Sequence, residues 1–101
     1  MSAANHKLTA LLAGRSIANG TASAGIETIH FADGSQLTIR LATDVSMSIV
    51  TAGAIDKVRQ SVDPAELYLD LQNGTTFTAQ LAEATSCVLL RDANGHLEYA
   101  D

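Results

Sequence analysis

Residue types suited to acid–base, nucleophilic and metal chemistry occur in this sequence, but they are scattered. The three histidines, His6, His30 and His96, lie far apart, and none stands at metal-ligand spacing from another histidine, cysteine or carboxylate. The single thiol, Cys87, stands in an apolar stretch, where we expect it to be buried and inert. We therefore predict no catalytic residue, no metal site and no cofactor.

The glycines are predicted to form turns, and none belongs to a catalytic or phosphate-binding motif. The sequence has no Gly-x-Ser-x-Gly elbow, no phosphate-binding glycine loop and no His-Glu-x-x-His motif. Gly20, Gly34, Gly74 and Gly95 each follow Asn or Asp, which is the usual composition of a tight turn.

Four side chains on predicted strand surfaces are the best candidates for binding: His30, Arg40, Tyr68 and Asp70. Tyr68 offers a flat amphipathic contact, and Arg40 with Asp70 could orient a polar partner. Threonines surround these residues and suit exposed strands by propensity alone, so an ordinary solvated sheet surface is the competing interpretation.

Two matching hairpins must position these residues. Residues 29–42 align without a gap on residues 69–82, and apolar residues fall on the odd positions of both segments outside the turns. Asp33-Gly34 and Asn73-Gly74 predict type I turns followed by a left-handed glycine bulge, with Ile29 opposite Leu37 and Leu69 opposite Phe77. The predicted inward residues are Ile29, Phe31, Leu37, Ile39 and Leu41, and Leu67, Leu69, Leu71, Phe77 and Leu81.

The similarity extends into two units of roughly 40 residues, 15–53 and 54–101. Residues 46–50 match residues 86–90, so each unit is expected to form a meander of about four strands, and the last strand of the chain could close against the first. Asp63-Pro64 predicts a turn in the second unit. Its counterpart in the first is placed at residues 23–25, in preference to Asn19-Gly20.

A short helix over residues 5–13 precedes these units. Leu8, Leu11 and Leu12 have helical spacing, Asn5 or Ser2 can cap the start, and Gly14 can end it. The predicted fold is one mainly β domain over residues 1–101, a small barrel or sandwich. The alternative treats each unit as a propeller blade, which would require several chains to close a ring.

Composition restricts the class of partner. The chain has 101 residues, 47% of them hydrophobic but only two Tyr and two Phe, so its core is thin and association would help it. A net charge of −5 disfavours nucleic acid and anionic membranes. A single cysteine and an N-terminus without a targeting pattern predict a cytoplasmic protein.

These observations favour a non-catalytic interaction or assembly module that is homo-oligomeric or binds another protein. The alternative is a small-molecule-binding protein or small enzyme, with an unidentified ligand in a pocket inside the barrel or between subunits.

Overall fold

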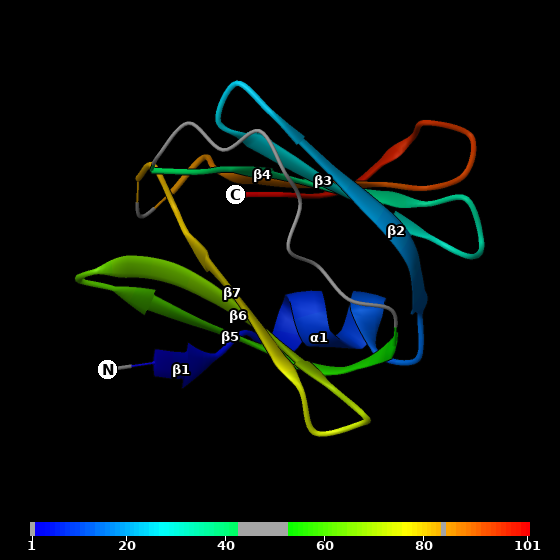
Figure 1. Ribbon diagram of the computed structural model, residues 1–101, viewed down its shortest axis with the longest axis horizontal. Coiled ribbons are helices and arrows are strands. Elements are labelled where there is room, and N and C mark those ends of the chain that lie inside the picture. The colour runs from blue at the N-terminus through cyan, green and yellow to red at the C-terminus, as the bar shows by residue number, and fades with distance from the viewer. Residues whose placement is uncertain (1, 43–52, 84) are drawn as a thin grey trace.

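The computed structural model describes residues 2–42, 53–83 and 85–101 (Figure 1). Within these ranges the elements are β1 (Ser2–Ala4), α1 (His6–Leu12), β2 (Ser16–Ser23), β3 (Ile26–Phe31), β4 (Gln36–Arg40), β5 (Gly53–Val62), β6 (Ala65–Leu71), β7 (Thr76–Gln80), β8 (Val88–Arg91) and β9 (Leu97–Ala100). The predicted mainly β fold with one short helix is confirmed.

All strands pair antiparallel in one sheet of order β7-β6-β5-β2-β3-β4-β8-β9, with β1 alongside β5. The sheet folds into two parts, β1-β5-β6-β7 and β2-β3-β4-β8-β9, which meet where Ser16 and Ile17 pair with Ala54 and Gly53. Figure 1 shows the two parts facing each other with α1 between them. The apolar core fills this space, because each part turns its buried side chains inward.

The sheet is not closed into a barrel, so the barrel form of the predicted barrel or sandwich is wrong. One isolated bridge, Leu41 to Leu81, joins the far sides of the two parts, supported by hydrogen bonds from Ala42 N–H to Gln80 O (2.8 Å) and from Ala82 N–H to Arg40 O (3.1 Å). Within the described residues no ladder continues from this bridge. Contact at a single point holds the two parts together there without the continuous hydrogen bonding that a barrel needs.

Both hairpins have the predicted register, with Ile29 opposite Leu37 and Leu69 opposite Phe77. Gly34 and Gly74 have φ of +91° and +88°, the left-handed conformation that the bulge requires. Of the ten predicted inward residues, nine are buried and Leu41 is half-buried. Alternation in the sequence therefore identified the core face of both hairpins.

The arrangement as two equal four-stranded units is not observed. β8 was expected to extend the second unit, but it pairs with β4 of the first, and β9 pairs with β8 instead of closing on the first strand. The chain beyond Leu81 crosses to β4, where Arg40 N–H donates to Cys87 O (2.8 Å). One continuous sheet also differs from the separate sheets of propeller blades. Residues 46–50, the expected counterpart of β8, lie outside the described residues.

The first turn lies at Ala24-Gly25, as preferred, and Asp63-Pro64 forms the turn between β5 and β6. Helix α1 is capped by Asn5, whose Oδ1 accepts from Leu8 N–H (3.0 Å). The three-residue strand β1 was not predicted, because it is too short to show an alternating pattern.

Helix α1 is fastened to both parts of the sheet. On β5, Val58 N–H donates to Thr9 Oγ1 (2.9 Å) and Val58 O accepts from Asn5 N–H (2.9 Å). Toward β9, the Asn5 amide donates to the Tyr99 hydroxyl (3.0 Å). Leu8 and Leu12 are fully buried in the core. The helix therefore fills the open side between β5 and β9.

Gly34 and Gly74 provide a matched pair for substitution. Alanine at either position adopts a positive φ, at a cost of about 1 kcal/mol. A Cβ on Gly34 would also lie 3.1 Å from Ala93 Cβ, whereas one on Gly74 meets nothing within 4 Å. Gly34→Ala is therefore expected to destabilise the protein more than Gly74→Ala in urea unfolding. Equal losses would contradict this packing of the β3–β4 turn on the β8–β9 turn.

Candidate functional site

The four predicted binding residues separate into two pairs. Tyr68 and Asp70 lie on β6, in one part of the sheet, whereas His30 on β3 and Arg40 on β4 lie in the other. In the described portion of the chain, no hydrogen bond or ion pair joins one pair to the other. A single site containing all four is therefore not formed within one chain.

Tyr68 and Asp70 belong to a polar cluster on the outer surface of β5, β6 and β7. Arg59 donates from Nε and Nη2 to the two carboxylate oxygens of Asp70 (2.7 and 2.9 Å), and its guanidinium stacks on the Tyr68 ring, 4.8 Å from the centroid. The Tyr68 hydroxyl donates to Glu66 (2.6 Å), and Thr76 Oγ1 donates to Asp70 (2.8 Å). These five residues form the Arg59 cluster.

The Arg59 cluster braces three neighbouring strands. The side-chain hydrogen bonds from Arg59, followed by that from Thr76, hold the pKa of Asp70 below its usual range. Both carboxylate oxygens of Asp70 already accept hydrogen bonds within the fold. A ligand that bound Asp70 would have to compete with these contacts. Arg59 was missed as a partner because its pairing with Tyr68 depends on the β5–β6 register.

The lowered pKa of Asp70 predicts a stability change in acid. An unfolded Asp titrates near pH 3.9, so the contribution of the ionised carboxylate is complete above about pH 4 and is lost as the pH falls through the lower folded pKa. The stability deficit of Asp70→Asn relative to wild type in urea should therefore be larger at pH 7 than at about pH 2. The exposed Asp56→Asn is the control. An Asp70→Asn deficit that is the same at both pH values would contradict this role.

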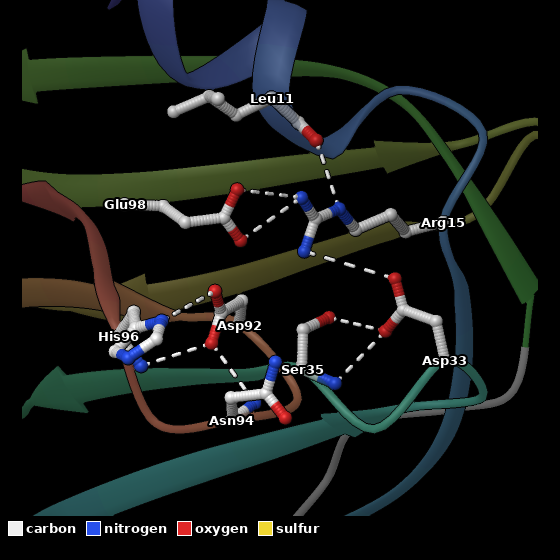
Figure 2. A network of polar contacts seen from close by, with 8 residues as sticks. All are labelled: Leu11, Arg15, Asp33, Ser35, Asp92, Asn94, His96 and Glu98. Atoms are coloured by element: carbon white, nitrogen blue, oxygen red, sulfur yellow. Dashed lines mark hydrogen bonds and ion pairs between the residues drawn. The ribbon is translucent and has the colours of Figure 1, made fainter.

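Arg15 organises a second cluster that sequence reasoning missed (Figure 2). Its Nε donates to Leu11 O (2.9 Å) at the end of α1, and its Nη2 donates to both carboxylate oxygens of Glu98 on β9 (3.1 and 3.2 Å). Its Nη1 lies 3.8 Å from Asp33 Oδ2 in the β3–β4 turn. The Ser35 hydroxyl, then the Ser35 amide, and also Arg15 keep the pKa of Asp33 below its usual range.

A solvent-open pocket of about 480 Å³ lies beside Arg15, between the end of α1 and the β3–β4 turn. The charged residues that line it are Arg15 and Asp33, which already form an ion pair with each other. A ligand there would compete with contacts that tie α1, β3–β4 and β9 together. We interpret the pocket as the solvent-facing side of these structural contacts. No local sequence pattern predicts the contacts of Arg15, because Asp33 and Glu98 are distant from it in the sequence.

His30 and Arg40 lie on a different surface, the outer side of β3, β4, β8 and β9. The register places Thr28, Thr38 and Leu89 in one row and His30, Gln36 and Arg91 in the next. Leu97 continues the second row on β9. We call the following set the cationic face: Thr28, His30, Gln36, Thr38, Arg40, Leu89, Arg91 and Leu97. Leu89, Arg91 and Leu97 were missed because β8 and β9 were assigned to the other unit.

The two arginines of the cationic face are exposed and only lightly engaged. Arg40 donates one hydrogen bond to Ser86 O at 3.4 Å, and Arg91 donates one to Gly95 O at 3.1 Å. Neither forms an ion pair within the described ranges. Each guanidinium therefore keeps donors directed to solvent.

Carboxylates are missing from the outward strand positions of this face. Of the two acidic residues on its described strands, Glu27 is 2% exposed on the inner side and Glu98 binds Arg15. Asp92 in the β8–β9 turn accepts from the amides of His96 and Asn94, which lower its pKa. Asp101 lines a shallow surface pocket with Ser86 and Leu89, at the end of the face where Arg40 donates to Ser86 O. In a chain of net charge −5, the outward positions of these described strands therefore carry two arginines and no carboxylate.

Residues 2–42, 53–83 and 85–101 contain no group of three or more His, Cys, Asp or Glu residues able to hold a metal ion. No helix in these ranges is long and apolar enough to span a bilayer. The class that fold and surface define is a mainly β protein built on one antiparallel sheet. Comparison with protein-family models, curated proteins and solved structures finds no match to this chain.

Proposed function

We propose that the protein is a non-catalytic interaction module that binds another protein through the cationic face. The observation that carries this proposal is the exposed pair Arg40 and Arg91 on a surface whose outward strand positions lack carboxylates, in an acidic chain. The lone buried thiol of Cys87 fits a reducing location such as the cytoplasm.

The apolar residues of the face favour a protein partner. Leu89 and Leu97 are 37% and 52% exposed, close to Arg91. Arginine with apolar side chains is typical of protein interfaces. Nucleic acid binding draws its affinity from many phosphate contacts, and two arginines provide few.

The chemistry of the clusters supports a non-catalytic role. Arg15 and Arg59 hold their carboxylate partners within the fold. Among the described residues, His96 is the histidine that lies near a carboxylate, 3.5 Å from Asp92 in an exposed turn with backbone amides as the other partners. This arrangement stabilises the turn and presents no adjacent nucleophile.

Homo-oligomerisation through the cationic face itself is unfavourable. A two-fold axis places the same patch on both sides of an interface, so the arginines of two copies would be brought near one another. We therefore propose a different protein as the partner on this face. Self-association, if it occurs, would use another surface.

The experiment is site-specific photo-cross-linking in cells. A benzophenone amino acid replaces Leu89 on the cationic face or, as a control, Thr78, which is exposed on the outer side of β7. We expect a discrete cross-linked protein from position 89, absent from position 78 and lost when Arg40→Glu and Arg91→Glu are added. Cross-links of equal yield at both positions, or none at 89, would contradict the proposal.

A further inference from the structure

We infer that the partner of the cationic face is an extended acidic segment with two carboxylates four residues apart and an apolar residue midway. This inference rests on the proposed function and deepens it by naming the chemistry of the partner. It follows from where the sheet places Arg40, Leu89 and Arg91.

The two arginines are separated by a fixed distance. Arg91 pairs with Gln36, four positions from Arg40 along β4. With about 3.4 Å per residue along a strand and about 4.8 Å between strands, their Cα atoms lie about 14 Å apart. Regular pairing on both sides of β4 keeps this spacing constant, because β4 lies between β3 and β8.

An extended peptide matches this spacing. Its residues i and i+4 project to the same side and lie about 14 Å apart. Residue i+2 projects to that side between them and would meet Leu89 with Thr38, which are paired between the two arginines. Carboxylates are the natural partners, because guanidinium binds them by paired hydrogen bonds.

The chain itself contains this pattern once on an outer surface, as Glu66, Tyr68 and Asp70 of β6. A second copy could in principle present it to the cationic face. However, Glu66 accepts from the Tyr68 hydroxyl and Asp70 is held by Arg59 and Thr76. Docking this strand would break those contacts, so a segment of another protein is favoured over a second copy.

The test is titration of the isotope-labelled protein with a capped peptide of sequence Thr-Asp-Thr-Leu-Thr-Asp-Thr, followed by amide NMR shifts. We expect shifts centred on Thr38 and Leu89 and none on Thr78. Matched peptides carry Asn for both Asp, or place the two Asp three residues apart. Each should bind at least about fivefold more weakly, and Arg40→Glu with Arg91→Glu should weaken binding about tenfold.

Several outcomes would overturn the inference. One is equal binding of the three peptides; another is tighter binding of a single-stranded oligonucleotide than of the acidic peptide. A concentration-dependent dimer that protects both the cationic face and β6 would identify a second copy as the occupant. If cross-linking at Leu89 succeeds while the peptide fails, the inference is wrong and the proposed function stands. If both fail, the proposed function is wrong as well.

Discussion

Replacing Leu8 with alanine is expected to lower the free energy of unfolding by about 2–5 kcal/mol, the range for truncating a buried leucine. Leu8 is fully buried in the core, on the helix that fills the open side between β5 and β9. The cavity would remain, because Asn5 and Thr9 fasten the first half of the helix to Val58 and limit its movement into the space. The measurement is urea unfolding at pH 7.

Leu11→Ala is the matched control on the same helix. Leu11 is half-buried and borders the solvent-open pocket beside Arg15, so its truncation should cost clearly less than that of Leu8. If Leu8→Ala stays within about 0.5 kcal/mol of wild type, the helix is not part of the core. If both variants lose the same amount, the assigned inward face of α1 is wrong.

Removing residues 91–101 is expected to lower the melting temperature by at least about 10 °C. The cut deletes β9, and with it the hydrogen bonds from Cys87 and Val88 N–H to Asp101 O (2.6 and 2.7 Å) and from Asp101 N–H to Val88 O (2.9 Å). It also removes Tyr99 from the core and Glu98 from Arg15. At about 1 kcal/mol per hydrogen bond and 4–8 °C per kcal/mol, these losses together account for the change.

Glu98→Gln is the milder companion to this truncation. It keeps β9 and loses only the charge that binds Arg15, so a shift of a few degrees at most is expected. A chain ending at Leu90 that melts at the wild-type temperature would show that the β8–β9 hairpin contributes nothing to the sheet.

Local patterns predicted the hairpins well. The alternation of apolar residues such as Ile29 and Leu37 predicts which side of a strand is buried, and the position of Gly34 after Asp33 predicts a positive φ in the turn. The pairing of β8 with β4 joins residues about 50 positions apart, and no local pattern encodes such a choice. The matching of residues 86–90 with 46–50 suggested a meander, and the long-range pairing overrode it.

The candidate surface was predicted in part for the same reason. His30 and Arg40 were identified because their strands alternate clearly, whereas Leu89 and Arg91 join them only through the β4–β8 pairing. Arg15 and Arg59 were missed because their carboxylate partners come from other segments of the chain. Sequence patterns find which side of a strand is exposed, and topology decides which exposed sides become one surface.

The most direct test of the central claim is native mass spectrometry of the gently purified protein, compared with a variant carrying Arg40→Glu and Arg91→Glu. Both changes are on exposed side chains, so the variant should unfold at a similar urea concentration. The proposal predicts that the wild-type chain retains a protein partner of defined mass that the variant loses. A wild-type monomer carrying a discrete small-molecule mass, unchanged in the variant, would contradict it and favour a ligand-binding protein.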